Sequence, residues 1–403
     1  MAKLIYSLLT TALVQLANLG FGVAAARLLG TSDRGVLAYQ VTLSTVIATL
    51  FSFGISEAVA YKATTKSETH PHTSYLVLSV IYGAFGCVAW LLLYPTATSI
   101  TSADQYFAYL AFACYPLLNY GTLCFVAWFA GAGLTKAWNV QRLLVQLVQP
   151  LALGVLLLTY EPSITVFAFS IIGAHVLATA VGVWQLSLVV LVGKPRLTEM
   201  KELFLIGAQG FGSRLSNLVR DNADKLIVGT LVAPDILAQY VVAVSFAQLF
   251  NAYSQTIVQL YFSRIAGALN SKAFRIELRS ATLIGLGAVV AIAMSTFAGK
   301  WLVSTIFGVK FELAGKMAPL LVIGMVFASV KALISAHALA IRQPWIASKV
   351  DVYAIVPTFA LIFVSVKFAG VWGAAYAFIA SQALTAAFAV SIFLAKMSEL
   401  RRE

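Results

Sequence analysis

The segment from Gln209 to Gly229, QGFGSRLSNLVRDNADKLIVG, gathers charge in a chain that is otherwise almost continuously apolar. Its ionisable residues are Arg214, Arg220, Asp221, Asp224 and Lys225. On a helix, at about 100° per residue, all five fall within an arc of roughly 140°. In a membrane protein, such charges face a bundle interior or a water-filled cavity. The pattern predicts a helix that lines a polar cavity. The alternative is an exposed turn between two shorter membrane segments.

Arg214 is the predicted anion-binding residue of this segment. It follows Lys201 by about 13 residues, or about 20 Å of helix, which places it near the middle of a bilayer. The alternative role is a structural partner for Asp221, which shares its helix face at i+7.

The remaining charges of the segment form two pairs at i,i+4 spacing, where helical side chains meet. These predicted pairs are Arg220 with Asp224 and Asp221 with Lys225. For Arg220 and Lys225, substrate contact and a purely structural pair are both open. The two aspartates are assigned to coupling or gating.

Three further charged residues are candidates. Lys331 lies midway along another apolar stretch with no charged residue within a turn, so it is predicted to face the cavity or to pair with an acid on another helix. Arg27 ends the first apolar stretch and either meets an anion or snorkels to the interface. Glu57, with Lys62 nearby, is predicted to pair across helices or to take part in coupling.

The composition indicates a polytopic membrane protein. Of 403 residues, 61% are hydrophobic and 10% are charged, and the mean hydropathy is +0.90. A soluble domain averages about 25% charged residues. Long apolar runs with few breaks predict helices rather than a barrel. The first run reads as a span rather than as a signal peptide.

We predict twelve spans, in which the tryptophans near span ends, such as Trp90 and Trp138, form interface belts. Pro116, Pro150, Pro319 and Pro357 are predicted to lie inside spans, and His175 to be a hydrogen-bonded packing residue. The predicted spans are 4–27, 35–60, 73–94, 105–130, 137–159, 164–192, 202–231, 236–262, 279–299, 314–341, 346–367 and 370–395.

The basic residues predict the orientation. With both termini in the cytoplasm, seventeen of the 27 Lys and Arg residues lie on the cytoplasmic side, six lie on the opposite side and four lie within spans. This is a strong positive-inside bias. It explains the net charge of +12 without nucleic acid.

The two halves of the chain contain corresponding turn motifs. A tight polar turn and an immediate return helix follow the first span in RLLGTSDRGVLAY and the seventh in GTLVAPDILAQY. This predicts an all-α membrane protein with twelve transmembrane helices in two pseudo-symmetric six-helix lobes, residues 1–195 and 196–403, around a central cavity. No metal site or cofactor is expected.

Several motifs resemble the Wzx-like polysaccharide flippases of the MOP superfamily. The similarity includes ARLLG with FSFGISEA in the first half, Asp224-Lys225 followed by LIVG, and GVWGAAYAF near the end. Asn139 and Arg142, at the start of the fifth span, fit the same pattern, as do Arg342 and Pro344. Ala238, where a Gly is usual, and the short C-terminal extension are departures.

The resemblance implies a flippase, not an enzyme. It implies movement of a polyprenyl-diphosphate-linked oligosaccharide from the cytoplasmic to the periplasmic leaflet of the bacterial inner membrane, for lipopolysaccharide or exopolysaccharide biosynthesis. Undecaprenyl diphosphate is the lipid carrier that it suggests, and a polysaccharide polymerase or assembly protein is a possible partner. The expected substrate-binding residues are Arg214, Lys331, Arg220, Lys225, Arg27 and Arg142; Asp224, Asp221 and Glu57 are expected to serve coupling or gating.

Two other classes remain open. A drug or cation antiporter of the same superfamily needs acidic cavity residues, whereas the candidate cavity residues within spans comprise four cations, Arg214, Arg220, Lys225 and Lys331, against two acids, Asp221 and Asp224. That sign favours an anionic substrate. An integral membrane glycosyltransferase needs clustered catalytic carboxylates or histidines, and the loops are short.

Overall fold

The computed structural model describes residues 2–64, 72–93, 101–187, 194–265, 271–340 and 345–400, and the chain is all-helical in these ranges. The motif residues Arg342 and Pro344 and the predicted break from Lys66 to Pro71 lie outside the described residues. Contacts divide the chain into two compact units, Met1–Leu218 and Val219–Glu403. The lobe boundary between residues 195 and 196 stays a prediction.

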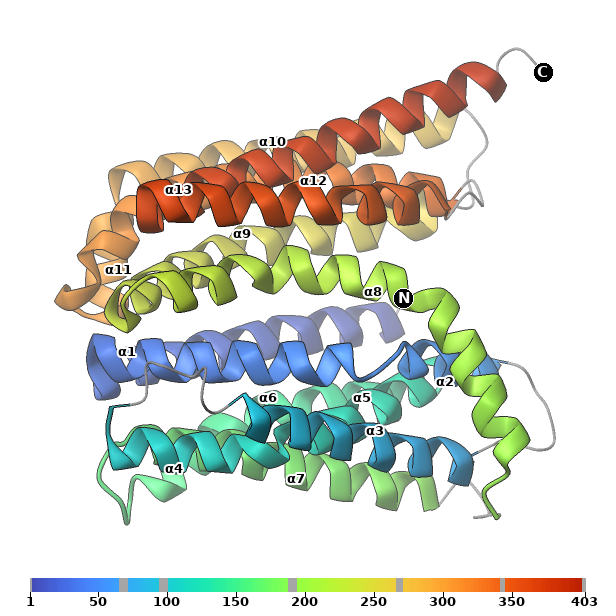
Figure 1. The fold of residues 1–403 in the computed structure, drawn as a ribbon. Helices are drawn as coiled ribbons and strands as arrows, with labels where there is room; N and C mark the ends of the chain where they lie inside the picture. The colour runs from blue at the N-terminus through green and yellow to red at the C-terminus, as the bar shows by residue number, and fades with distance from the viewer. Residues whose placement is uncertain are drawn as a thin grey trace. The chain divides into compact units, whose positions relative to one another are not determined.

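The first unit is a bundle in which α5 packs against α2, α3, α6 and α7, and α6 also packs against α1 (Figure 1). Its last helix, α8, runs on into the second unit. The elements are α1 (Ala2–Leu50), α2 (Ile55–Thr64), α3 (His72–Leu92), α4 (Ala103–Ala111), η2 (Phe112–Cys114), α5 (Tyr115–Gly131), α6 (Thr135–Leu156), α7 (Ile164–Ser187) and α8 (Leu197–Leu231).

The second unit is built around α12, which packs against α9, α10, α11 and α13. Its elements are α9 (Pro234–Ile265), α10 (Ser271–Phe297), α11 (Gly299–Phe307), η3 (Val309–Phe311), α12 (Glu312–Ala340) and α13 (Trp345–Leu400).

Two glycines break the longest helices. Gly30 in α1 has φ 74° and Gly370 in α13 has φ 55°, so each label covers two helices joined at a kink. Only glycine enters this region of φ readily. The predicted turns after the first and eleventh spans are thereby confirmed.

Each of the twelve predicted spans overlaps a helix. Within the described residues, eight stretches are long and apolar enough to cross a membrane, and two of these, Thr10–Leu50 and Lys349–Ala395, contain the kinks. Helices α6 and α8 are not among the eight. The helical class is confirmed, and the count of twelve spans in two lobes stays a prediction.

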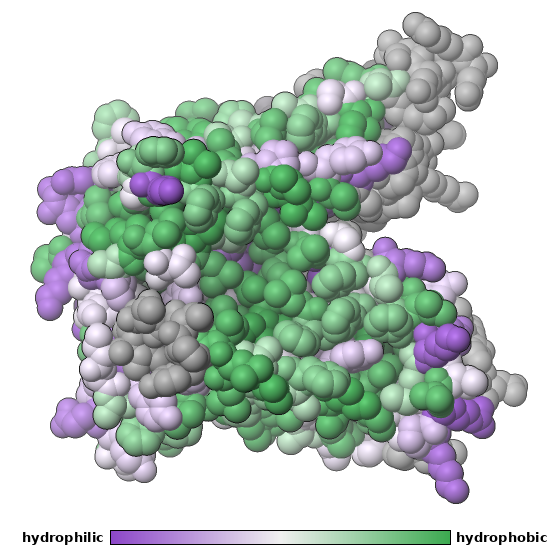
Figure 2. Space-filling view, viewed as in Figure 1, coloured by the Kyte–Doolittle hydropathy of each residue, from purple (hydrophilic) through white to green (hydrophobic). Residues whose placement is uncertain are grey.

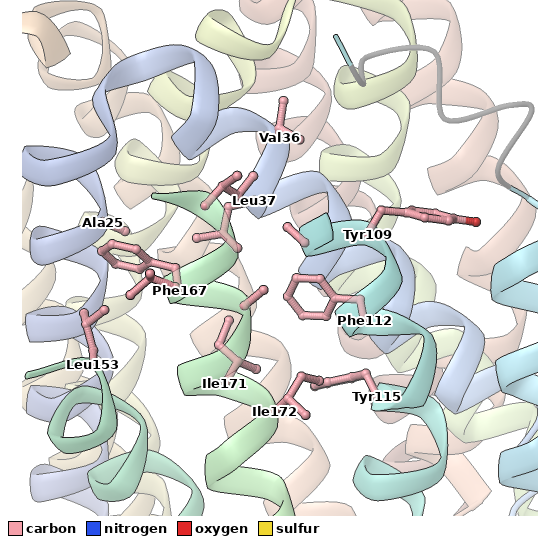
Figure 3. Packing of buried hydrophobic residues seen from close by; sticks show 14 of the residues in the cluster. Ala25, Val36, Leu37, Tyr109, Phe112, Tyr115, Leu153, Phe167, Ile171 and Ile172 are labelled. Atoms are coloured by element: carbon pink, nitrogen blue, oxygen red, sulfur yellow. The ribbon is translucent and has the colours of Figure 1, made fainter. Parts of the chain in front are cut away.

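The core of the first unit is an apolar cluster between α1, η2 and α7. Leu37, Phe112, Phe167 and Ile171 are all at most 5% exposed, and in Figure 3 these side chains lie around α7. In both units, hydrophobic side chains cover the flanks of the helices and hydrophilic ones gather toward helix ends (Figure 2). Lipid tails can cover such apolar flanks, which fits a multi-pass membrane protein.

Two buried rings differ from their predictions. Trp90 is fully buried, stacks on Tyr109 at 4.8 Å and donates from Nε1 to the Tyr109 carbonyl at 2.8 Å, so the interface-belt prediction is wrong for it. His175 packs against the Tyr115 ring at 4.8 Å, but its two nitrogens have no hydrogen-bond partner among the described residues. The predicted hydrogen bonding of His175 is therefore wrong.

All four prolines lie inside spans as predicted. Pro150, Pro319 and Pro357 lie inside α6, α12 and α13. Pro116 lies inside the stretch Ala103–Gly131, in the first turn of α5 directly after η2. The missing N–H of proline is harmless at a helix start, which explains why the helix begins there.

Candidate functional site

In the first unit, α8 presents Arg214 to a carboxylate of α2. Arg214 Nη1 lies 2.8 Å from Glu57 Oε1, and the two side chains are 23% and 38% exposed. The partner of Arg214 is thus Glu57 rather than Asp221, and Glu57 pairs across helices rather than with Lys62. Arg214 therefore pairs with a residue of another helix. Helix packing places the Glu57 carboxylate beside Arg214, whereas the i+7 spacing along α8 does not bring Asp221 into contact with it.

A backbone contact sets the geometry of this pair. The turn between α1 and α2 contains two residues of positive φ, Phe53 at 44° and Gly54 at 72°. A Cβ on Gly54 would lie 2.1 Å from the carbonyl oxygen of Gly207 in α8. The two backbones therefore touch, and Glu57 and Arg214 each follow their contact glycine by one or two helical turns.

Polar contacts tie the first turns of α8 to α2 and α3. Lys62 of α2 forms an ion pair with Glu202. Ser74 of α3 donates from Oγ to Glu199 Oε2 at 2.7 Å and accepts the backbone N–H of Arg196 at 3.0 Å. The sequence reasoning missed Glu199 and Glu202, although both stand at the charged start of a predicted span.

In the second unit, one carboxylate serves two cations. Lys331 of α12 forms an ion pair with Asp351 Oδ1 of α13, and Arg220 Nη1 lies 3.6 Å from the same oxygen. Arg220 Nε also lies 3.1 Å from Asp221 Oδ1. We call Lys331, Asp351, Arg220 and Asp221 the shared-carboxylate cluster.

Lys331 therefore has an acid partner on another helix, which is the alternative that the sequence left open. The side chains of Lys331 and Asp351 are only 8% and 11% exposed. Sequence reasoning missed Asp351, although an acid inside the predicted span 346–367 was a signal of the same kind as Lys331.

Asp224 takes no part in the predicted pair with Arg220. It is 2% exposed, and its Oδ2 accepts a hydrogen bond from the Tyr240 hydroxyl at 2.7 Å. Its Oδ1 has no hydrogen-bond partner in the part of the chain that the structure describes. The predicted Arg220–Asp224 pair is wrong, because Arg220 reaches toward α13 while Asp224 faces α9.

Lys225 contacts the backbone carbonyl of Asp221 and not its carboxylate. Its Nζ donates to the Asp221 carbonyl at 2.6 Å, while the Asp221 carboxylate pairs with Arg220. The predicted ion pair between these two side chains is replaced by this contact.

The observed partners remove the excess of positive charge that the sequence suggested. When the partners Glu57 and Asp351 are added to the charged residues that the sequence singled out on α8 and α12, this set contains four cations and four acids. They are Arg214, Arg220, Lys225 and Lys331, and Glu57, Asp221, Asp224 and Asp351. Charge balance lowers the cost of holding these groups among apolar helices.

The remaining two predicted cations lie on α1 and α6. Arg142 has its guanidinium carbon 4.7 Å from the centre of the Trp138 ring, and its Nη2 donates to Thr11 Oγ1 at 3.4 Å. No carboxylate contacts Arg142 among the residues that the structure describes. Arg27 is exposed on α1 before the Gly30 kink.

A metal site requires several donor side chains that lie close together. The described ranges hold no group of three His, Cys, Asp or Glu side chains placed to bind an ion. The charged side chains described above instead form ion pairs with one another.

One family of known proteins matches this chain over most of its length. The family described as "Polysaccharide biosynthesis protein" matches residues 1–266. A search of curated proteins finds no match.

Several solved membrane-protein structures share the fold. The lipid II flippase MurJ in an inward closed conformation aligns with a TM-score of 0.79 at 12% identity, over 96% of this chain and 88% of that one. An inward-facing multidrug resistance transporter of the MATE family, in the MOP superfamily, aligns with a TM-score of 0.74 at 13% identity, over 96% of both chains. A MOP superfamily transporter from Pyrococcus furiosus, described as having a binding pocket of reverse polarity, aligns with a TM-score of 0.68 at 13% identity, over 99% of this chain and 96% of that one. At these identities the similarity shows the fold.

Proposed function

Because the chain belongs to the polysaccharide biosynthesis protein family, we propose that it is a flippase for a polyprenyl-diphosphate-linked oligosaccharide. It moves this lipid from the cytoplasmic to the periplasmic leaflet of a bacterial inner membrane, with both termini in the cytoplasm. The movement is transport and not a chemical reaction. Residues 1–195 and 196–403 act as two lobes that open the central cavity alternately to each side.

The observation that carries the proposal is the partly exposed Arg214–Glu57 pair among apolar helices. The hydrocarbon rejects the diphosphate and the sugar hydroxyls of such a substrate, whereas the lipid tail can stay in the bilayer. A guanidinium binds phosphate oxygens through parallel charged hydrogen bonds. Arg214 supplies that group where the exposure of its side chain leaves it open to a ligand.

The other charged residues have supporting roles in the proposal. Lys331, Arg220, Lys225, Arg27 and Arg142 contribute positive charge along the path of the diphosphate. Glu57 and Asp221 hold or release Arg214 and Arg220 as the lobes move, and Asp224, held by Tyr240, contributes to coupling or gating. A polysaccharide polymerase or another assembly protein receives the glycan on the periplasmic side.

Reconstituted vesicles test the function directly. The full-length chain is placed in proteoliposomes with a fluorescent polyprenyl-diphosphate oligosaccharide, and an impermeant glycosidase or quencher reports the lipid in the outer leaflet. We expect the wild type to equilibrate the lipid between leaflets, and Arg214→Gln to slow this about tenfold or more. Equal leaflet movement in protein-free vesicles and in wild-type vesicles would contradict the proposal.

A cation or drug antiporter is the second candidate, and the equal number of acids and cations is the observation that favours it. Acids such as Asp224 can bind an organic cation in the same fold. The same vesicles loaded with a fluorescent cationic dye decide between the two. Dye efflux driven by an ion gradient, with no movement of any lipid-linked sugar, would replace the flippase by the antiporter.

A further inference from the structure

We propose that Glu57 competes with the phosphate groups of the substrate for Arg214. In the empty protein, the carboxylate of Glu57 holds the guanidinium; in the loaded protein, a phosphate oxygen takes its place. The inference rests on the proposed function and adds to it the exchange step at the site.

The pairing between Glu57 and Arg214 is incomplete. The two carboxylate oxygens have different partners, since Oε1 lies 2.8 Å from Arg214 Nη1 and Oε2 accepts from Ser56 Oγ at 2.8 Å. Arg214 Nε has no hydrogen-bond partner in the described part of the chain. The pair therefore lacks the second of the two parallel bonds that make arginine–carboxylate contacts strong. A diphosphate offers Arg214 more acceptor oxygens and more negative charge than the single Glu57 oxygen that contacts it here.

The exposure of the pair favours exchange. The Arg214 and Glu57 side chains are 23% and 38% exposed. By contrast, Lys331 and Asp351 are nearly enclosed. An ion pair near solvent is weak because water screens it, whereas separating a buried pair leaves an unpaired charge in apolar surroundings. Arg214 is therefore the cation of these two groups that a ligand can take over at low cost.

The surroundings of Glu57 stay in place when the pair opens. The contact between Gly54 and Gly207 and the ion pair between Lys62 and Glu202 join α2 to α8 independently of Arg214. Ser56 keeps a hydrogen bond to Glu57. The carboxylate thus remains beside Arg214 and re-forms the pair once the phosphate leaves, which makes Glu57 a positioning residue that opposes permanent substrate binding.

Binding measurements test the competition. The full-length chain in lipid nanodiscs is titrated at low ionic strength with two probes, inorganic diphosphate and farnesyl diphosphate. We expect Glu57→Gln to bind the diphosphate probes more tightly than the wild type, by up to about five-fold, which is the worth of a partly exposed ion pair. Arg214→Gln is expected to weaken binding about tenfold. Tighter binding of farnesyl diphosphate than of inorganic diphosphate indicates that the ligand is a lipid.

Glu202→Gln is the matched control, because it removes a carboxylate from the other ion pair between the same two helices. We expect this variant to bind like the wild type. An equal gain in Glu202→Gln and Glu57→Gln would mean that lost negative charge, and not competition, causes the effect, and the inference would fall. Unchanged or weaker binding by Glu57→Gln would overturn it as well.

Glu57→Ala provides a second variant if Glu57→Gln folds poorly by thermal melting. The two proposals fail separately. Leaflet transport by the wild type without a gain in either Glu57 variant overturns the exchange step and leaves the flippase. A gain in diphosphate affinity without leaflet transport supports the exchange step and removes the flippase.

Discussion

Two groups of opposite charges lie in the two units, and they differ in how exposed their side chains are. In the first unit, Arg214 and Glu57 are 23% and 38% exposed and share a single contact. In the second, Lys331 and Asp351 are 8% and 11% exposed, and Arg220 adds a second cation to the same carboxylate. The same chemistry thus produces an exchangeable pair in one unit and a structural cluster in the other.

The difference follows from solvation. A pair near solvent contributes about 0.2–1 kcal/mol, whereas loss of one partner from a buried pair destabilises a protein by about 3–5 kcal/mol. Charged residues inside apolar helices are therefore not equivalent as binding candidates. Exposure and the number of contacts separate those that can receive a ligand from those that hold the helices together.

The largest effect is expected for Lys331→Ala. It removes the closer of the two cations that contact Asp351 Oδ1, so we expect a loss of about 3–5 kcal/mol and a lower melting temperature in detergent. The double variant Lys331→Ala with Asp351→Ala removes both charges and is expected to melt above the single variant. A single variant as stable as the wild type would show that the cluster is not structural.

Gly54→Ala breaks the backbone contact that positions Glu57. Alanine at positive φ is strained by about 1–2 kcal/mol, and the new methyl group also meets the Gly207 carbonyl. Gly133→Ala is the matched control, because Gly133 has φ 70° and nothing within 4 Å of an added Cβ. We expect both variants to melt lower than the wild type and Gly54→Ala to fall further; equal losses would remove the role of the contact.

Tyr240→Phe tests the buried carboxylate of the second unit. It removes the hydroxyl that donates to Asp224 Oδ2, and we expect a loss of about 1–3 kcal/mol because the carboxylate loses that hydrogen bond. Urea or thermal unfolding measures the change. Tyr253→Phe, which removes a hydroxyl that donates to the Leu283 carbonyl from an exposed residue, is a milder control. A larger loss in the control would contradict the importance of burial.

Glu312→Gln gives the smallest expected effect. Glu312 Oε1 lies 2.8 Å from Lys300 Nζ and 3.1 Å from Lys316 Nζ, and all three side chains are exposed. Water and salt screen such contacts, so we expect no measurable change of melting temperature at 0.15 M salt. A shift comparable to that of Lys331→Ala would refute the rule that burial decides the effect.

Much of the architecture was predictable because it depends on local properties. Apolar runs predicted helices over the described residues. The polar turn after the first span predicted the break at Gly30, and the bounds of the last two spans predicted the break at Gly370. The turn motifs indicated the family that the match over residues 1–266 supports. The burial of Trp90 was not predicted, because its position near a span end does not reveal that the Tyr109 carbonyl of α4 accepts its N–H.

The sequence by itself determined which helix carries the charges: Arg214, Arg220 and Asp224 fall on one face of α8 because the helical period places them there. Only the tertiary structure decided their partners. Glu57 and Asp351 are far from α8 along the chain, and local i,i+4 spacing favoured other pairs. Long charged side chains reach neighbouring helices, so packing and solvent exposure select the partner and separate a releasable ion pair from a fixed one.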